Sequence, residues 1–124
     1  KALGILEFMG LGSVKHEIAG NLPYGKQKIL SVCIALATHP ELLLLDEPVA
    51  GMNQTEIQTM VKLIGQIRSK GITVVVVEHN MQAVMALCDR IVVLNYGCKI
   101  AEGLPKEIRD NQEVIEAYLG KEEI

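Results

Sequence analysis

Two short stretches constrain the fold of this chain more than any others. Leu42–Leu45 is apolar at every position, and Ile72–Val77 consists entirely of β-branched residues. Such runs are typical of strands that are covered on both faces. The segment between them has its apolar side chains at helical spacing, at Ile57, Met60, Val61, Ile64 and Ile67. Strand and helix therefore alternate, which predicts an α/β fold with a mainly parallel sheet flanked by helices.

The other elements are predicted from apolar spacing and from chain breaks at glycine and proline. A helix near Lys26–Thr38 is apolar almost all round from Ile29 onward, so we expect it to be buried on most sides. The remaining predictions are a helix at Ala2–Met9, a polar connection at Ser13–Asn21, a helix face at Met81, Val84, Met85 and Cys88, a third strand at Ile91–Leu94 with an antiparallel partner at Cys98–Ala101, and short helices from Pro105 and over Asn111–Leu119.

Composition excludes several classes of protein. The 124 residues fit one compact domain, and 49% of them are apolar, which argues against disorder. A net charge of −3 and 3% aromatic residues give no reason to expect nucleic acid as a partner. The longest nearly apolar run, Ile29–Ala37, is far shorter than the roughly 20 residues that cross a bilayer. No secretory signal is recognised, and Cys33, Cys88 and Cys98 are interpreted as packing residues of a reduced protein.

Acidic and polar residues follow two of the predicted strands. Asp46-Glu47 comes directly after the first strand and Glu78-His79 after the second, and ligands of parallel sheets bind at this edge. Burying unpaired carboxylates is costly, so we expect a partner such as phosphate-bound magnesium at Asp46. Glu47, pointing the other way along an extended chain, could then orient or deprotonate a water. Alternatively, Asp46 only caps the next turn and Glu47 is solvated.

Two further stretches bear on the same chemistry. "NLPYGKQ" (Asn21–Gln27) is a glycine-containing turn that opens a helix, and free N–H groups at such a turn can bind an anion. His79 could hydrogen-bond a terminal phosphate. Alternatively, the first stretch is an ordinary helix start and His79 is a helix-entry residue bonded to nearby backbone.

Taken in order, these motifs resemble the C-terminal part of an ABC transporter ATP-binding subunit. "NLPYG" is similar to the signature motif, "LLLLDEP" to the Walker B strand, "AGMN" (Ala50–Asn53) to the D-loop, and "DRIVVLNYGCKIAEG" to the closing hairpin, while His79 matches the switch histidine. Within the family, "AGNLPYGKQ", "EHNMQAVMALCDRI" and "VIEAYLG" are most similar to branched-chain amino-acid importers. The resemblance implies a partial P-loop ATPase core.

The resemblance also implies roles for individual residues. Asp46 would hold Mg²⁺, Glu47 would be the catalytic base, and His79 would contact the γ-phosphate of ATP. In the family's sandwich dimer, two further groups would lie across the interface: Tyr24, Gly25 and Lys26 would face the partner's nucleotide, and Gly51, Met52 and Asn53 would line the dimer seam. The implied partners are a second ATP-binding subunit, membrane permease subunits and, indirectly, a periplasmic binding protein. The implied location is the cytoplasmic face of the inner membrane.

The sequence departs from the family pattern at several positions. Pro23 replaces the signature serine, Tyr24 the first glycine, Lys26 the glutamine and Asn53 the D-loop aspartate, while Ile29 and Ile34 stand where arginine is frequent. Lys26 could compensate only as a point charge. No Gly-x-x-x-x-Gly-Lys-Ser/Thr loop occurs in the sequence, so the β- and γ-phosphate cradle is missing.

The chain is therefore interpreted as a fragment with three parts. Residues 1–40 would be a remnant of the helical subdomain, residues 41–104 the core from Walker B to the closing hairpin, and residues 105–124 the C-terminal helices. We expect open sheet edges and no useful ATP turnover by the chain alone. Competing interpretations are the ATPase of a lipopolysaccharide-export or urea-import system, and a non-catalytic dimerising module. A DNA-repair or chromosome-organising ATPase is disfavoured, because no heptad run exists.

Overall fold

A computed structural model describes residues 1–119 of the chain. These residues form two compact units, Lys1–Ala83 and the segment from Val84 onward, and each is described by itself. The end of the predicted C-terminal part, residues 120–124, lies outside the described residues. None of the helices formed by residues 1–119 combines the length and the apolar character that a membrane crossing requires.

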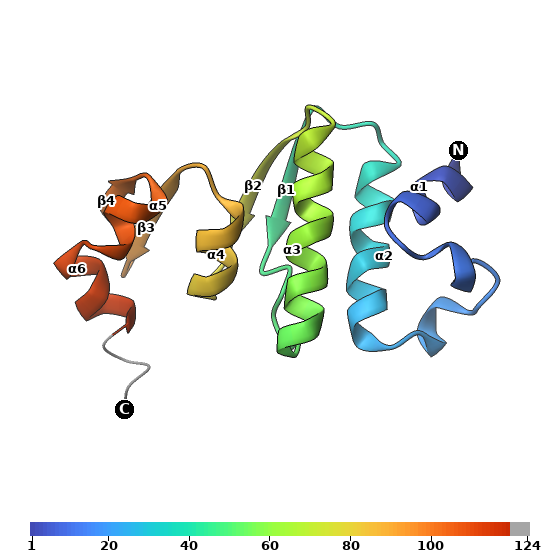
Figure 1. Cartoon of the computed structure of the whole chain (residues 1–124), viewed down its shortest axis with the longest axis horizontal. Helices are drawn as coiled ribbons and strands as arrows, with labels where there is room; N and C mark the ends of the chain where they lie inside the picture. The colour runs from blue at the N-terminus through green and yellow to red at the C-terminus, as the bar shows by residue number, and fades with distance from the viewer. Residues whose placement is uncertain (120–124) are drawn as a thin grey trace. The chain divides into compact units, whose positions relative to one another are not determined.

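The first unit contains a pair of strands and three α-helices (Figure 1). Its elements in chain order are α1 (Ala2–Phe8), η1 (Gly12–Val14), η2 (Ala19–Asn21), α2 (Tyr24–Leu36), β1 (Leu42–Asp46), α3 (Gln54–Ser69) and β2 (Thr73–Val77). The predicted helices and strands of this part are confirmed to within a few residues. The predicted polar connection at Ser13–Asn21 contains short 3₁₀ turns.

The sheet of the first unit is parallel and two-stranded, with Leu42 opposite Thr73 and Asp46 opposite Val77. One face is covered, since α2 packs on β1 and α3 on β2. Leu43 and Leu45 of β1 are buried there at 3% and 9% exposure. The apolar side of α3 completes this core, where Met60, Ile64 and Ile67 are almost entirely buried. The helical spacing read from the sequence therefore gives the correct inward face.

The other face of the β1–β2 sheet is open, which corrects the prediction that both strands are covered on both sides. Leu44 is 69% exposed and Val77 60% exposed, and Leu42 and Val75 lie on the same open side. Within residues 1–119, each strand pairs only with the other, so the outer edge of each is unpaired, as the sequence predicts. A strand that is apolar on both faces is able to be covered on both faces, but its own sequence does not show whether other segments cover them.

Helix α2 is also less enclosed than predicted. Its buried residues, Gly25, Ile29, Val32, Cys33 and Leu36, lie along one side, whereas Ile34 is 65% exposed. The prediction of burial on most sides is therefore wrong for the side that carries Ile34. Burial raises the pKa of the Cys33 thiol above its ordinary value, which keeps that thiol protonated and unreactive.

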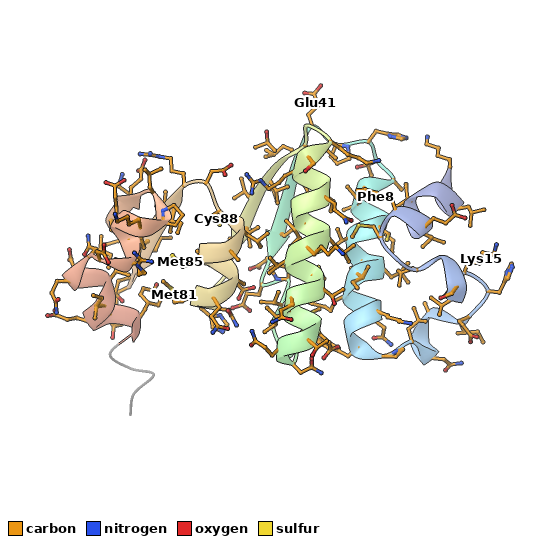
Figure 2. All side chains as sticks on the ribbon, viewed as in Figure 1. Phe8, Lys15, Glu41, Met81, Met85 and Cys88 are labelled. Carbon is orange, nitrogen blue, oxygen red and sulfur yellow. The ribbon has the colours of Figure 1, made fainter. Side chains whose placement is uncertain are left out.

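The ends of α3 are defined by local chemistry. Asn53 caps the helix, because its side chain accepts from the Glu56 N–H at 2.9 Å and the Glu56 carboxylate accepts from the Asn53 N–H at 3.1 Å. The helix ends at Ser69 with Lys70 as its C-cap, and Gly71 follows at φ +90°. The Lys70 ammonium lies 4.1 Å from the ring centroid of Phe8 on α1, which is labelled in Figure 2.

The second unit is built on an antiparallel hairpin of β3 (Ile91–Asn95) and β4 (Cys98–Gly103). Tyr96 and Gly97 form the turn between these strands with φ of 49° and 77°, which is typical of a type I′ hairpin turn. Sequence alternation places the third strand in a parallel sheet, but β3 pairs with β4 and, within residues 1–119, with no other strand. The parallel part of the chain thus consists of β1 and β2.

Short helices follow the hairpin, namely α5 (Pro105–Arg109), α6 (Gln112–Val114) and the π-helical turn η3 (Ile115–Leu119). Ile91, Val93, Ile108 and Val114 form the core of this unit, and Met85 and Cys88 pack against it (labelled in Figure 2). Helix α4 (Met81–Leu87) spans the boundary between the two units. The three cysteines are free thiols, and the interpretation as packing residues is wrong for Cys98, which is exposed.

Candidate functional site

The carboxyl ends of β1 and β2 lie side by side and bring the predicted strand-end residues together. Asp46 is opposite Val77 in the parallel register, and the Glu47 N–H donates to the Val77 carbonyl at 2.7 Å. Asp46-Glu47 and Glu78-His79 therefore leave the same edge of the sheet. We call Asp46, Glu47, Glu78 and His79 the strand-end cluster.

Glu47 does not continue the extended strand. The prediction that an extended chain points Glu47 away from Asp46 is therefore wrong. Its φ of 49° places it in the left-handed region, so the chain turns sharply at this residue. Its side chain is 49% exposed and Asp46 is also exposed, so burial of unpaired carboxylates does not arise here. A strained backbone at a non-glycine residue is frequent at functional sites. The turn at Glu47 directs its carboxylate across the sheet edge toward the residues that follow β2.

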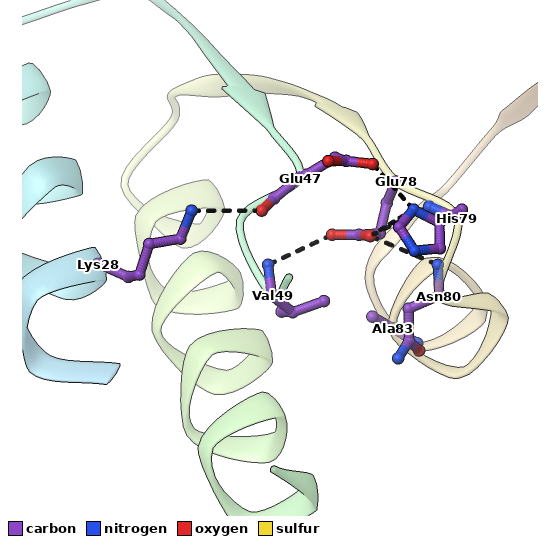
Figure 3. A network of polar contacts seen from close by, with 7 residues as sticks. All are labelled: Lys28, Glu47, Val49, Glu78, His79, Asn80 and Ala83. Atoms are coloured by element: carbon purple, nitrogen blue, oxygen red, sulfur yellow. Dashed lines mark hydrogen bonds and ion pairs between the residues drawn. The ribbon is translucent and has the colours of Figure 1, made fainter. Parts of the chain in front are cut away.

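His79 is the partner of Glu47. The Nδ1 atom of His79 lies 2.9 Å from Glu47 Oε1 and 3.8 Å from Glu78 Oε1 (Figure 3). The imidazole is 68% exposed and can donate from Nδ1 when neutral or charged. A carboxylate that accepts from a histidine at this edge is oriented for proton transfer to or from a bound water.

Asp46 is the single residue for which the sequence predicts metal binding. Within residues 1–119, no group of three or more His, Cys, Asp and Glu side chains could hold a metal ion. One exposed carboxylate fits Mg²⁺ only in the way that Mg²⁺ usually binds with nucleotides, where water and phosphate oxygens supply most of the ligands. The donor set here therefore fits a magnesium ion that arrives with a phosphate ligand.

Glu78 is a residue of this site to which the sequence analysis assigns no role. Its side chain is only 2% exposed, although neighbouring side chains of the cluster are open to solvent. Glu78 Oε2 accepts from the Val49 N–H at 3.3 Å, while Glu78 Oε1 accepts from the His79 N–H at 3.0 Å and the Asn80 N–H at 3.4 Å (Figure 3). The available signal was a glutamate placed directly after a strand of β-branched residues.

The loop from Glu47 to Asn53 connects the strand-end cluster to the residues predicted for the dimer seam. The Ala50 N–H donates to the Glu47 carbonyl at 3.2 Å and the Met52 N–H to the Val49 carbonyl at 3.2 Å, so the loop consists of consecutive turns. Pro48 and Val49 are buried and anchor it. Lys28 Nζ on α2 lies 3.5 Å from the Glu47 carbonyl.

The signature turn, defined here as Tyr24, Gly25 and Lys26, contacts this loop through its tyrosine. The Tyr24 hydroxyl donates to the Ala50 carbonyl at 3.0 Å. A Cβ on Gly51 would lie 3.2 Å from the Tyr24 ring, and Gly51 has φ +76°. Glycine is therefore required at position 51 both by its backbone and by the close approach of the ring.

The rest of the signature turn packs on the beginning of α3. A Cβ on Gly25 would collide with Glu56 Oε2, which belongs to the same carboxylate that completes the Asn53 capping box. Asn53 thus has a structural role as the helix cap, and the Asn53-x-x-Glu56 spacing is the sequence signal that could have shown it. Gly25, Lys26 and Met52 also line a pocket of about 550 Å³ between α1, α2 and α3.

Two family models match parts of the chain, and both describe ABC transporters. The model described as ABC transporter matches residues 1–50, and the model described as branched-chain amino acid ATP-binding cassette transporter matches residues 98–124. The first match contains the signature turn, Asp46 and Glu47.

Curated relatives agree with this. The chain is 44% identical over 117 residues to the high-affinity branched-chain amino acid transport ATP-binding protein BraF of Pseudomonas aeruginosa. The aligned part is 94% of this chain and 46% of BraF. The chain is 43% identical over 117 residues to LivG of Escherichia coli K12, with the same coverage. A probable LivG of Archaeoglobus fulgidus is 36% identical and covers 99% of this chain and 48% of that protein. The chain thus spans about half the length of these relatives.

Solved structures share the fold. The ADP conformation of an ATP-binding cassette of an ABC transporter matches with a TM-score of 0.88 and 32% identity, over 97% of this chain and 49% of that one. A nucleotide-free ATP-binding cassette matches with a TM-score of 0.86 and 30% identity, over 94% of this chain and 48% of that one.

Proposed function

The chain belongs to the ATP-binding subunits of ABC transporters, and on that premise we propose that it is the half of such a subunit that carries the catalytic base and the signature turn. The full-length subunit, meaning this sequence extended to the length of its relatives, would hydrolyse ATP to drive transport. The observation that carries the proposal is the 2.9 Å contact between Glu47 and His79 at the carboxyl edge of β1 and β2.

The chemistry follows from the positions of these side chains. Glu47 would accept a proton from a water as the water oxygen attacks the γ-phosphorus of ATP and the bond to the β,γ-bridging oxygen breaks. When both of its ring nitrogens carry a proton, His79 would donate one hydrogen bond from Nε2 to a γ-phosphate oxygen and one from Nδ1 to the Glu47 carboxylate, which would keep that carboxylate oriented. Asp46 would hold Mg²⁺, which supplies charge neutralisation at the phosphates.

Parts of the reaction are assigned to groups beyond this sequence. The sequence lacks a Gly-x-x-x-x-Gly-Lys-Ser/Thr loop, so the β- and γ-phosphates would be gripped by the remainder of the full-length subunit. The signature turn and the loop residues Gly51, Met52 and Asn53 would face a second ATP-binding subunit. Membrane permease subunits, served by a periplasmic binding protein, would place the assembly at the cytoplasmic face of the inner membrane.

The cargo we propose is a branched-chain amino acid. Two likenesses support this: the family model that matches residues 98–124 is of the branched-chain amino acid type, and so are the curated relatives BraF and LivG by name. Cargo does not contact the ATP-binding subunit, so the assignment depends on the transporter with which the subunit assembles.

The test is ATP hydrolysis by the assembled transporter with and without leucine and its binding protein. Leucine should stimulate turnover, and Glu47→Gln should lower turnover by roughly 10²-fold or more while ATP binding is retained, because only the water-activating group is lost. Glu41→Gln is the matched control, since Glu41 is an exposed glutamate at the other end of β1 (labelled in Figure 2). Normal hydrolysis by Glu47→Gln would refute the role of Glu47, and stimulation only by an unrelated solute would refute the cargo.

A further inference from the structure

Glu78 stands out among the acidic side chains of the first unit because it is nearly buried and yet contacts backbone from two different loops. Its side chain is 2% exposed, compared with 49% for Glu47 a few ångströms away. A buried carboxylate is costly unless hydrogen bonds compensate for its lost hydration. Backbone N–H groups donate these hydrogen bonds to Glu78, so the fold stabilises the carboxylate in its buried position.

The donors come from both sides of the sheet edge. The Val49 N–H belongs to the loop after β1 and donates to Oε2, whereas the His79 and Asn80 N–H groups belong to the loop after β2 and donate to Oε1 (Figure 3). Each carboxylate oxygen therefore serves one loop. The two loops are those that carry the proposed base and the proposed phosphate-contacting histidine.

The backbone contacts extend the connection in both directions. Val49 is 3% exposed and lies two residues after Glu47, whose carbonyl accepts from the Ala50 N–H. Asn80 Oδ1 accepts from the Ala83 N–H at 3.0 Å, which fixes the chain just after His79 to the beginning of α4. A displacement of Glu78 would therefore move the backbone next to Glu47 and the backbone of His79 relative to each other.

We propose that Glu78 is a positioning residue, which clamps the loop after β1 to the loop after β2 so that Glu47 and His79 meet in the geometry needed for catalysis. The effect of this clamp on catalysis rests on the proposed ATPase function, whereas the clamp itself does not. Glu78 does not exchange a proton with the reacting atoms. It acts through the backbone of Val49 and His79.

Glu78→Gln separates the clamp from the volume of the side chain. Glutamine has the same shape but only one acceptor oxygen, so its amide group must face one of the two sets of N–H donors without accepting. One loop is thereby released while the core packing is retained. Glu107→Gln is the matched control, because the Glu107 carboxylate accepts from the Leu104 N–H at 3.0 Å at the start of α5, outside the strand-end cluster.

The first measurement is amide hydrogen exchange in the chain itself, which needs no ATP turnover. Glu78→Gln should speed exchange of the Val49 or the His79 amide at least about tenfold, with the amides of α3 unchanged, whereas Glu107→Gln should alter only the Leu104 region. Unchanged protection of both Val49 and His79 would overturn the clamp, whatever the enzyme does.

The second measurement is steady-state ATP hydrolysis by the full-length subunit in its transporter. Glu78→Gln should lower kcat about tenfold to a hundredfold and leave KM for ATP within about twofold, since a misplacement of about 1 Å in the site costs rate and not ground-state binding. A wild-type kcat in Glu78→Gln with released amides would overturn the catalytic consequence. Absence of turnover in the wild-type subunit would instead refute the proposed function, and the exchange result would still decide the clamp.

Discussion

The strand-end cluster and the signature turn are held in place by different kinds of contact. The strand-end cluster depends on backbone pairing, since the parallel register sets Asp46 opposite Val77 and the Glu47 N–H continues the ladder to the Val77 carbonyl. The signature turn depends on side chains, because the Tyr24 hydroxyl bonds to Ala50 and the Gly25 backbone packs on Glu56. Any two adjacent parallel strands bring their ends to one edge, and the Glu78 side chain then sets the placement of Glu47 and His79 relative to each other. The signature turn, in contrast, depends throughout on side chains of residues far apart in the sequence.

This contrast predicts that changes in the strand-end cluster alter chemistry with little loss of stability, and that changes around the signature turn alter stability first. Among the substitutions that test this contrast, His79→Ala gives the largest expected effect. It removes an exposed side chain and should leave the fold intact, but turnover by the full-length subunit should fall roughly 10²-fold because the Glu47 carboxylate loses its hydrogen-bond donor. ATP binding should weaken far less, as measured by titration calorimetry.

His16→Ala is the control for this variant, because His16 is an exposed histidine of the same unit outside the cluster. It should hydrolyse ATP at the wild-type rate. If His79→Ala lost binding and turnover to the same extent, His79 would contribute only to ATP binding, and its proposed role in orienting the Glu47 carboxylate would be wrong.

The same contrast explains which features could be predicted from the sequence. The meeting of Asp46-Glu47 with Glu78-His79 was predictable, since it needs only two strand assignments and the rule that parallel strands share a carboxyl edge. The direction of Glu47 was not, because nothing in the neighbouring sequence indicates a left-handed backbone at this non-glycine residue. The role of Glu78 was missed for a related reason: nothing local indicates that its carboxylate turns back onto Val49.

The exposure of side chains was the least predictable property. Leu42–Leu45 reads as a strand buried on both faces, yet Leu44 is 69% exposed, because the helices of the first unit that pack on the sheet, α2 and α3, cover one face. Ile34 on α2 is likewise an apolar side chain that was expected to be buried and is exposed. The apolar pattern of a segment shows which of its side chains favour burial. Whether they are buried depends on the segments that pack against them in the assembled protein.

Gly51→Ala tests whether the signature turn depends on close packing. The substitution should destabilise the first unit by about 2–3 kcal/mol, the sum of a left-handed alanine at φ +76° and a Cβ placed 3.2 Å from the Tyr24 ring. Gly10→Ala is a matched control, because Gly10 has φ +79° but nothing within 4 Å of an added Cβ. Urea denaturation of the chain should show a loss of only about 1–2 kcal/mol for Gly10→Ala. Equal losses would mean that the Tyr24 ring moves aside at no cost.

Tyr24→Phe gives the smallest expected effect, because it keeps the ring over Gly51 and removes only the hydroxyl. Loss of the 3.0 Å bond to the Ala50 carbonyl should cost about 0.5–1 kcal/mol at this half-exposed position. Tyr118→Phe, which removes the hydroxyl that donates to the Leu94 carbonyl in the second unit, is the matched control. Both variants should lose stability in urea, but only Tyr24→Phe should also lower ATP turnover in the transporter, because Ala50 lies in the loop that begins at Glu47. An unchanged turnover in Tyr24→Phe would show that the signature turn and the strand-end cluster are independent of each other within the chain.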